Sequence, residues 1–298
     1  MAKKPEISVI MGIYNQNDRG RLESAIQSIL CQSFTDFEFI IYDDGSDEKI
    51  KNWLMEYAAM DERIRIISNT INHGLAYSLN SCIDVARGKY LARMDDDDIS
   101  LPNRFQKQYD FLENHSEYAF VGCGAKLMDD SGIWGLRLMT QEPGERDFLR
   151  FSPYIHPTVM IRRSVFDEAD NLYSDAKDNL RCEDYELFMR LWKKGLKGYN
   201  LQEALFVYRE DKDAYDKRKF TYRIDEMKLR YRSFKELHML FPRGWIYVIR
   251  PLIAAMVPSE IILKTKRAYH KYMLNEVPVI ENTVSTIPKE LEKLPKII

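Results

Sequence analysis

Cysteines are few in this sequence, and none of them is paired. Cys31, Cys82, Cys123 and Cys182 show neither a CxxC spacing nor a nearby pair of histidines. This pattern argues against a disulfide framework and against a zinc site, and it favours reduced thiols.

A signal-peptide pattern and a long apolar run are also missing. Lys3, Lys4 and Pro5 lead straight into a strand-like run, so we expect no signal peptide. The apolar stretch 245–258 contains Arg250 and Pro251 and is shorter than the ~20 residues that a spanning helix needs. Of the 298 residues, 45% are hydrophobic and 30% are charged. This composition supports one large domain with an appendage, or two small domains.

Charge is nearly balanced over the whole chain but unevenly distributed. The net charge is −2, yet residues 212–274 carry 15 Lys and Arg against 6 Asp and Glu, while residues 1–211 carry 26 against 36. The basic region therefore suits an anionic partner. Because acidic residues and apolar runs are mixed into it and no nucleic-acid motif is present, we do not expect nucleic acid to be that partner.

Apolar runs alternate with helical stripes in the first hundred residues. The runs cover residues 7–11, 37–42, 64–67 and 90–94. The alternation predicts an α/β fold with a mainly parallel sheet and helices on both faces. Right-handed crossovers would bring the acidic turns after the second and fourth runs to one edge of the sheet.

The second half is less regular. We expect strands at 120–123, 155–161 and 204–208, a loop-rich segment at 129–155, and a helix that begins near Glu183-Asp184 and ends near Gly195. The strand at 155–161 would carry His156 at its mouth.

Four adjacent carboxylates, Asp95-Asp96-Asp97-Asp98, form an acidic tetrad after the fourth run. Neighbouring carboxylates repel one another unless water or a cation neutralises them. Mg²⁺ and Mn²⁺ favour oxygen ligands and often bridge a carboxylate to a substrate phosphate. The tetrad therefore fits a metal-diphosphate site, but it also fits a solvated turn before a helix that begins near Pro102. The residues alone leave both interpretations open.

Several motifs follow one another in a definite order between residue 6 and about residue 210. They are Ser8 to Met11 with Tyr14-Asn15, Ser28 to Phe34, Asp43-Asp44-Gly45-Ser46, Asn72-His73-Gly74, Ala86 to Tyr90, the acidic tetrad with Pro102, and Glu183-Asp184. Together they resemble the family 2 glycosyltransferases of the GT-A fold. Two places depart from the family pattern: Gly12-Ile13 stands where Pro-Thr is common, and Leu79-Asn80 where Arg-Asn is common.

The resemblance implies a GT-A-type nucleotide-binding sheet flanked by helices, with a mainly helical C-terminal extension. The catalytic domain would cover residues 1–211, with a donor half over about 6–102 and an acceptor half over about 103–211. A basic amphipathic helical extension would cover 212–274, and a flexible tail 275–298.

The resemblance also implies that the tetrad binds a nucleotide-sugar donor through Mn²⁺ or Mg²⁺. Asp97 would be the main metal ligand, Asp95 the other end of the DxD motif, and Asp96 a ribose contact. The cation would stabilise the negative charge that builds up on the diphosphate leaving group. Arg209, after the last predicted strand, is either a further diphosphate contact or a surface charge.

The nucleotide base would lie against the end of the first two strands. By resemblance, Asp44 would accept a hydrogen bond from a uracil-type base, Ile13 and Tyr14 would line its pocket, and Asn15 would assist. The alternative for Asp44 is a turn-forming role beside Gly45.

An acceptor hydroxyl must lose its proton as it attacks, and a carboxylate within hydrogen-bond reach can take it. By resemblance, Asp184 is this base, Glu183 is an acceptor contact, and His156 lies near the acceptor. The alternatives are first-turn helix carboxylates favoured by the helix dipole and a strand-end histidine packed beside Pro157. Direct displacement by the acceptor oxygen would invert the anomeric centre.

The whole-chain hypothesis is an inverting, metal-dependent hexosyltransferase that uses UDP-hexose or UDP-N-acetylhexosamine to build a surface polysaccharide such as O-antigen or capsule. Its acceptor would be a lipid-linked glycan on the cytoplasmic face of the cell membrane. Trp245, Tyr247 and the basic residues around them suit peripheral attachment to an anionic membrane surface. The alternatives for this extension are a helical cap on the catalytic domain or a dimer interface.

Two other whole-chain functions remain. A sugar-phosphate nucleotidylyltransferase would need a glycine-rich phosphate loop with a basic residue, which the stretch from Gly12 to Gly20 does not provide. A non-catalytic nucleotide-sugar-binding or membrane scaffold protein would not need Asp184.

Overall fold

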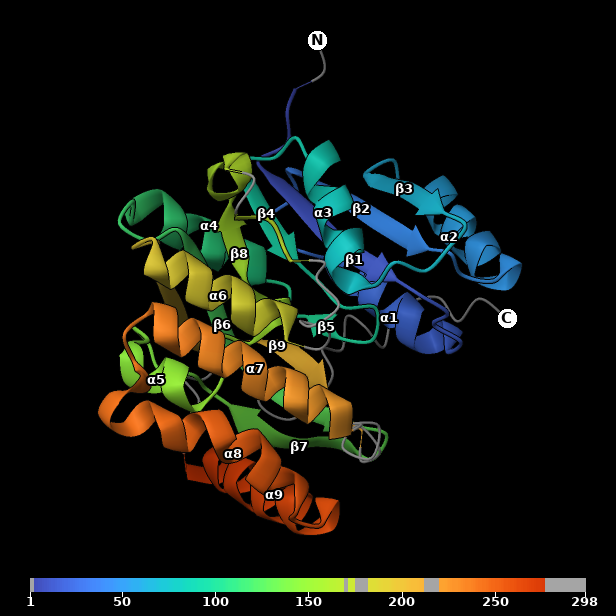
Figure 1. Ribbon diagram of the computed structural model, residues 1–298. Coiled ribbons are helices and arrows are strands. Elements are labelled where there is room, and N and C mark those ends of the chain that lie inside the picture. The colour runs from blue at the N-terminus through green and yellow to red at the C-terminus, as the bar shows by residue number, and fades with distance from the viewer. Residues whose placement is uncertain (1–2, 169–170, 175–181, 212–219, 277–298) are drawn as a thin grey trace.

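The computed structural model describes residues 3–168, 171–174, 182–211 and 220–276 (Figure 1). A nine-stranded sheet has the order β3-β2-β1-β4-β8-β6-β9-β5, with β7 paired to β6 beside this path. The strands are β1 (Ile7–Ile13), β2 (Phe37–Asp44), β3 (Ile64–Asn69), β4 (Tyr90–Arg93), β5 (Ile99–Ser100), β6 (Phe120–Asp129), β7 (Gly132–Arg137), β8 (Met160–Arg162) and β9 (Gly198–Arg209). The helices are α1 (Arg19–Leu30), α2 (Glu48–Met60), α3 (Leu75–Val85), α4 (Arg104–Asn114), α5 (Glu145–Arg150), α6 (Glu183–Lys193), α7 (Phe220–Glu236), α8 (Trp245–Ala255) and α9 (Ser259–Glu276).

The sheet is parallel in its first half and mixed in its second. Strands β3, β2, β1 and β4 pair in parallel, which confirms the α/β prediction for the donor half. Strand β8 is antiparallel to both β4 and β6, and β5 is antiparallel to β9. Strands β6 and β9 pair in parallel. The mainly parallel sheet that the first hundred residues predict is therefore confirmed for β1 to β4, and the antiparallel pairs enter only with the less regular second half.

Two hydrophobic cores cover the two faces of the sheet. Successive strand residues point to opposite faces, so Val9 and Met11 join one core and Ile10 joins the other. Helices α1, α2 and α4 complete the first core, and α3, α6 and α7 complete the second. Figure 1 shows α3, α6 and α7 in front of the sheet. The prediction of helices on both faces is confirmed.

Close packing between β1 and α3 depends on Gly12. A Cβ atom at this position would lie 2.9 Å from the Cβ atom of Ser78, which is closer than real Cβ contacts permit. The departure from Pro-Thr at this position therefore goes with a helix that lies tightly on the end of β1.

Several predicted elements of the second half have different bounds. His156 lies in a 3₁₀ turn, His156–Thr158, and not in a strand, because Pro157 lacks the N–H group that a central strand needs. The segment 129–155 contains β7 and α5 and is less irregular than expected. Strands β6 and β9 extend well beyond the predicted 120–123 and 204–208, since both are paired along most of their length.

The C-terminal extension is helical, as predicted, and α7 packs into the second core through Leu229 and Phe234. The buried Arg230 of α7 donates through Nη1 to the carbonyl oxygen of Leu149 at 2.9 Å, at the C-terminal end of α5. Arg250 of α8 donates to the next carbonyl oxygen, that of Arg150, at 2.6 Å. These cations satisfy carbonyl groups that a helix end leaves without partners.

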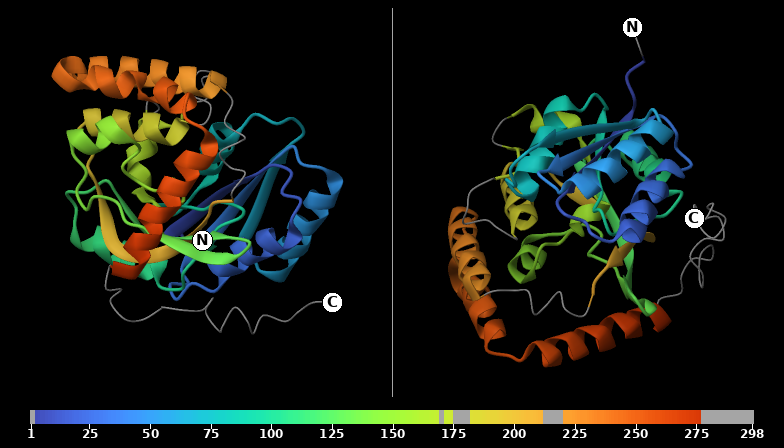
Figure 2. Two further views of the ribbon diagram at one scale, coloured as in Figure 1. Left: turned by 90° about the horizontal axis from the view of Figure 1, so that it is seen from below. Right: turned by 90° about the vertical axis from the view of Figure 1, so that its right-hand side faces the viewer.

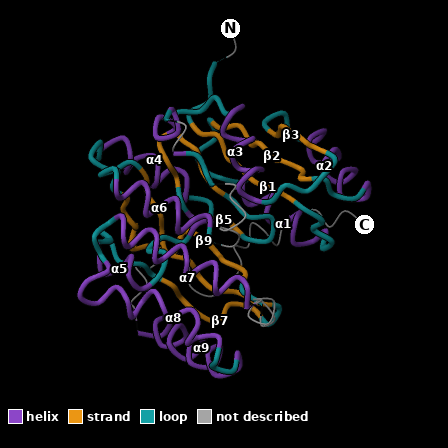
Figure 3. The backbone as a smooth tube through the Cα atoms, in the orientation of Figure 1, coloured by secondary structure: helices purple, strands orange, loops and turns teal. Residues whose placement is uncertain are grey.

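Helix α9 lies along β7, at the far side of the extension from α7 (Figure 2). Figure 3 shows the helices α5 to α9 gathered on one side of the molecule. The helix includes the first two residues of the predicted tail 275–298, and the remaining tail residues, from 277 onward, lie outside the described residues.

Among the described helices, none is by itself long and apolar enough to cross a membrane. The pair Leu240–Ala255 and Glu260–Asn275, bent by 116°, meets the length and composition criterion only when taken together.

The docking of α9 onto β7 buries the ring of His270. Its Nδ1–H donates to the carbonyl oxygen of Leu136 at 2.9 Å. Burial and the nearby charge of Arg137 lower the pKa of His270 to about 4, with Lys266 acting in the same direction and Glu210 against it.

We expect this histidine to make the fold sensitive to acid. Between pH 7 and pH 5 the unfolded chain gains a proton at His270, whose ordinary pKa is 6.5, while the folded chain does not until about pH 4. Folding should lose roughly 2 kcal/mol over this interval through this one group. Thermal unfolding of the wild type and of His270→Gln at both pH values measures the difference. Equal pH dependence in the two proteins would contradict it.

Candidate active site

The acidic turns predicted from the sequence meet at one edge of the sheet. Ile13 pairs with Asp43, and Ile10 pairs with Arg93, the last residue of β4. The parallel strands β2, β1 and β4 therefore end side by side, and the acidic tetrad leaves β4 next to the loop after β1.

Asn15 ties the loop after β1 to the turn after β2. It adopts a left-handed backbone conformation, with φ at 49°. Its backbone N–H donates to Ser46 Oγ at 3.0 Å, and its Oδ1 accepts from the Asp47 N–H at 2.9 Å. Asn15 thus has a structural role in shaping this edge. Tyr14 beside it is 53% exposed, whereas the side chain of Ile13 is buried in the first core. The predicted contacts of these three residues with a nucleotide base stay predictions.

Asp44 is buried and orders the turn before α3. Its carboxylate accepts from the backbone N–H groups of His73 at 3.0 Å and Gly74 at 2.7 Å, and from Asn69 Nδ2 at 3.1 Å. The turn-forming role is therefore present, and the predicted base contact stays a prediction. The ring of His73 lies 4.6 Å from that of Tyr77, between centroids, which places an aromatic surface beside this carboxylate.

Three carboxylates of the tetrad are engaged by neighbouring side chains or backbone. Asp95 forms an ion pair with Arg93, Asp96 accepts from Gln16 Nε2 at 3.3 Å, and Asp98 accepts from the Arg209 backbone N–H at 2.7 Å. The carboxylate of Asp97 makes no hydrogen bond or ion pair with any of the described residues, and one oxygen of Asp98 is buried without a partner among them.

Burial and mutual repulsion make the charged form of the tetrad carboxylates unfavourable. Burial, Asp97 and Asp95 raise the pKa of Asp96 to about 8, and burial and Asp95 raise the pKa of Asp97 to about 6. A divalent cation at Asp97 would relieve this repulsion, so the residues fit a metal ion. No three His, Cys, Asp or Glu side chains come together as a ready-made metal cage within the described ranges. The arrangement therefore fits a cation held by one or two carboxylates and completed by substrate phosphate.

Arg93 is the buried cation of the site. Its side chain is 3% exposed, and its Nε has no hydrogen-bond partner among the described residues. Its positive charge lowers the pKa values of Asp97 in the tetrad, of His156 and of Asp184. The charge of one guanidinium group therefore acts on the predicted metal ligands and on the predicted base alike.

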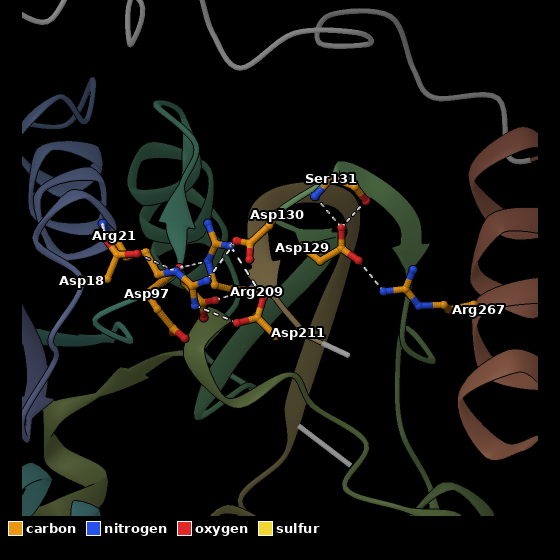
Figure 4. Close-up of polar contacts among 10 residues, drawn as sticks. Asp18, Arg21, Asp97, Asp129, Asp130, Ser131, Arg209, Asp211 and Arg267 are labelled. Atoms are coloured by element: carbon orange, nitrogen blue, oxygen red, sulfur yellow. Dashed lines mark hydrogen bonds and ion pairs between the residues drawn. The ribbon is translucent and has the colours of Figure 1, made fainter. Parts of the chain in front are cut away.

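Two further arginines reach the tetrad from outside (Figure 4). Arg209, at the end of β9, and Arg21, on α1, both lower the pKa of Asp97 by their charge, against the larger raising effect of burial. Both contact Asp130 in the turn between β6 and β7, Arg21 at 2.9 Å and Arg209 at 3.1 Å.

The predicted base and its neighbour lie in the first turn of α6. Burial raises the pKa of Asp184, while hydrogen bonds from the Tyr185 backbone and the Ser152 side chain oppose the shift. A carboxylate with a raised pKa is a stronger base than a solvated one, as the predicted role requires. Glu183 precedes it in the same turn. Their predicted roles toward an acceptor stay predictions.

His156 is buried beneath this site. Its Nε2 lies 2.8 Å from the Tyr173 hydroxyl, and burial lowers its pKa well below the ordinary value, with Arg93 adding to the effect. Asn80 holds the backbone of Tyr173 on both sides, accepting from its N–H at 2.9 Å and donating to its carbonyl oxygen at 2.8 Å. The ring of His156 therefore contacts Tyr173, and its predicted place near an acceptor stays a prediction.

Gln16, Arg21 and Arg93 were not predicted from the sequence as residues of this site. Arg93 had a visible signal, since it is a charged residue inside the apolar run that leads into the tetrad. Arg21 and Gln16 had none, because only the fold brings α1 and the loop before it to the tetrad.

Comparison with solved structures identifies the fold. The chain is similar to S. aureus TarS 1–349 in complex with UDP-GlcNAc, with a TM-score of 0.61 and 16% identity over 78% of this chain and 69% of that one. It is also similar to the mannosyltransferase PcManGT from Pyrobaculum calidifontis in complex with GDP-Man and Mn²⁺, with a TM-score of 0.56 and 16% identity over 90% and 81% of the two chains. The fold is that of the GT-A glycosyltransferases.

Sequence comparison identifies the family. Residues 8–169 match the model of glycosyl transferase family 2. The putative glycosyltransferase EpsE of Bacillus subtilis (strain 168) is 39% identical over 91% of this chain and 95% of its own. The O-antigen biosynthesis glycosyltransferase WbnJ of Escherichia coli is 32% identical over 68% and 79%. The chain belongs to glycosyl transferase family 2, as its motifs predicted.

We expect Arg93→Gln to destabilise the fold strongly, by about 3–5 kcal/mol, because it leaves the buried carboxylates without their counter-charge. Denaturant unfolding measures this, with Arg19→Gln as the control. Arg19 forms an ion pair with Glu56 whose two side chains are 44% and 48% exposed, so its loss should cost at most about 1 kcal/mol. Equal stability of the two variants would show that Arg93 does not balance the tetrad.

Proposed function

We propose that the protein is an inverting, metal-dependent hexosyltransferase. It transfers a sugar from a UDP-hexose or UDP-N-acetylhexosamine to a hydroxyl of a lipid-linked glycan during the synthesis of a surface polysaccharide. The observation that carries the proposal is the half-buried carboxylate of Asp97, which makes no hydrogen bond or ion pair with the described residues although it stands in a tetrad of four carboxylates. Relatives that act in polysaccharide synthesis by name, WbnJ and the amylovoran biosynthesis glycosyltransferase AmsE of Erwinia amylovora, support the substrate class.

On the donor side, Asp97 and Asp95 hold Mn²⁺ or Mg²⁺, and Asp96 contacts the ribose. The bound cation supplies Lewis acidity toward the diphosphate oxygens. Asp44 and the segment from Ile13 to Asn15 define the base site at the ends of β1 and β2. The Mn²⁺ complex of PcManGT and the UDP-GlcNAc complex of TarS support this choice of cofactor and donor class.

On the acceptor side, Asp184 removes the proton from the attacking hydroxyl. The acceptor oxygen forms a bond to the anomeric carbon while the bond from that carbon to the diphosphate oxygen breaks. The electron pair of the broken bond leaves with the nucleoside diphosphate, and the proton remains on Asp184. Attack from the side opposite the leaving group inverts the anomeric configuration. Glu183 contacts the acceptor, and His156 supports this side from beneath through Tyr173.

We further propose that α8 attaches the protein to the cytoplasmic face of the membrane. Apart from Arg250, the exposed large side chains of α8 are apolar; they include Ile246, Ile249 and Ile253, and Met256 directly follows the helix. The rings of Trp245 and Tyr231 lie 5.5 Å apart at the start of this surface. The excess of Lys and Arg in residues 212–274 matches an anionic lipid surface.

Two carboxylate variants separate donor binding from chemistry. Asp97→Asn should abolish the stabilisation of the folded protein by UDP with Mn²⁺, because the free metal ligand is lost. Asp184→Asn should keep that stabilisation and lower kcat by about 10²–10⁴-fold. Scanning fluorimetry and a UDP-release assay measure the two effects, with the exposed Asp84→Asn as control.

Unchanged turnover in Asp184→Asn would favour the non-catalytic binding protein. A product whose NMR spectrum shows the donor's anomeric configuration retained would refute direct displacement.

The double variant Ile249→Glu/Ile253→Glu should bind vesicles of anionic phospholipid at least about tenfold more weakly, since each charge opposes insertion of the apolar face. Vesicle co-sedimentation at low and high salt measures this. Met55→Glu is the control, because Met55 is an apolar residue of α2, away from this surface, and is 62% exposed, compared with 46% and 53% for Ile249 and Ile253. A wild-type protein that ignores vesicles but forms a dimer that the double variant loses would assign the surface to self-association instead.

A further inference from the structure

Helix α9 is joined by charged side chains to the ends of two strands. Arg267 forms an ion pair with Asp129, the last residue of β6, and Lys266 forms one with Glu210, directly after β9. Arg137 of β7 contacts the same Glu210 at 3.1 Å. Burial by itself would raise the pKa of Asp129, but hydrogen bonds from Arg267 and Ser131 outweigh it and lower the pKa to about 2.

Asp130 and Asp211, which follow Asp129 and Glu210 in the chain, point toward the tetrad instead (Figure 4). Asp130 contacts Arg21 at 2.9 Å and Arg209 at 3.1 Å. Asp211 contacts Arg21 at 2.7 Å. Consecutive residues of each strand end therefore alternate between α9 on one side and the arginines beside the tetrad on the other.

Arg209 links the second of these strand ends to the tetrad itself. Its backbone N–H donates to Asp98 at 2.7 Å, and its Nε reaches the carbonyl oxygen of Asp97 at 3.4 Å. A shift of the β9 end would move both contacts, because the backbone of residue 209 is covalently continuous with Glu210.

The carboxylates that face α9 are more buried than those that face the arginines beside the tetrad. The side chains of Asp129 and Glu210 are 5% and 11% exposed, whereas those of Asp211 and Asp130 are 28% and 79% exposed. A buried ion pair holds a narrow geometry and is costly to break, whereas an exposed pair is screened and contributes little. The contacts with α9 therefore hold the strand ends more tightly than the contacts of Asp130 and Asp211 with Arg21 and Arg209 do.

We propose that α9 is a positioning element of the donor site. Through Arg267 and Lys266 it fixes the two strand ends that hold Arg21 and Arg209 beside Asp97, where the two guanidinium groups attract the diphosphate of a nucleoside diphosphate. This inference rests on the proposed function, in which Asp97 marks the diphosphate end of the donor. It adds a dependence of donor affinity on a helix that touches no donor atom.

Charge reversal and its repair test this inference in the full-length protein. Titration calorimetry with UDP and Mn²⁺ gives the dissociation constant. Arg267→Glu and Asp129→Arg should each weaken binding by roughly 3- to 30-fold, the range expected for coupling through a packed network. The double variant Arg267→Glu/Asp129→Arg restores opposite charges and should recover most of the affinity. Lys264→Glu, an exposed charge change on the same helix, should have no effect.

A second measurement distinguishes an effect of Arg267 on the positions of Arg21 and Arg209 from a general disturbance of the fold. In the background Arg21→Gln/Arg209→Gln, Arg267→Glu should lose most of its effect on UDP binding, because the two guanidinium groups through which α9 acts are absent and only the backbone contact of residue 209 with Asp98 remains. In steady-state kinetics Arg267→Glu should raise the KM for the donor and leave kcat within about twofold. Arg267→Gln provides the milder change should the reversal prevent folding.

The outcomes discriminate between the claims. Wild-type binding of UDP with an unchanged dissociation constant in folded Arg267→Glu or Arg267→Gln overturns the positioning role alone. An undiminished loss of affinity on adding Arg267→Glu to the Arg21→Gln/Arg209→Gln background, or no recovery in the double reversal, also overturns it. A wild-type protein that binds no nucleotide with Mn²⁺ overturns the proposed donor site, and this inference with it.

Discussion

Mutual repulsion among the four carboxylates of the tetrad is the constraint on which the rest of the structure depends. The fold places them at the end of a buried strand, where burial adds to the repulsion and raises the pKa values of Asp96 and Asp97. It then balances them with Arg93 from within and with the Arg209 N–H from the side. Among the described residues, no side chain forms a hydrogen bond or ion pair with the Asp97 carboxylate, although the charges of Arg209 and Arg21 act on it. In the proposed function, this incomplete balance is what gives the cluster its affinity for a cation and its phosphate ligands.

The two halves of the sheet have different tasks at this edge. Parallel strands β1, β2 and β4 end together and carry the residues that are proposed to bind the donor, an arrangement that connecting helices produce without special side chains. The mixed half brings in elements that only long-range pairing can place, namely α6 with Asp184, the turn His156–Thr158 and the end of β9. Arg93, at the boundary strand β4, influences both sets of titratable groups.

Local sequence patterns predicted the donor half well, because each of its strands and helices carries its own period. Asp43, Asp44 and the tetrad follow such strands, so their meeting at one edge was predictable. The second half was not, because β8 has three residues and depends on its neighbours β4 and β6 for its pairing. His156 was predicted to lie in a strand because apolar residues follow it, but Pro157 cannot donate the hydrogen bond of a central strand, and the segment forms a 3₁₀ turn instead. The contacts of Arg21 and Arg267 join residues more than a hundred positions apart and leave no local trace.

The contact between α9 and the hairpin of β6 and β7 has a consequence for biosynthesis. The hydrogen bond of His270 with Leu136 and the ion pair of Arg267 with Asp129 span 134 and 138 residues of sequence. Such non-local closures form late in folding. During translation, the contacts of the hairpin with α9 cannot form before α9 has been synthesised. We therefore expect the parallel strands β1 to β4 and the acidic turns that follow them to be available for folding before the strand ends beside them are secured.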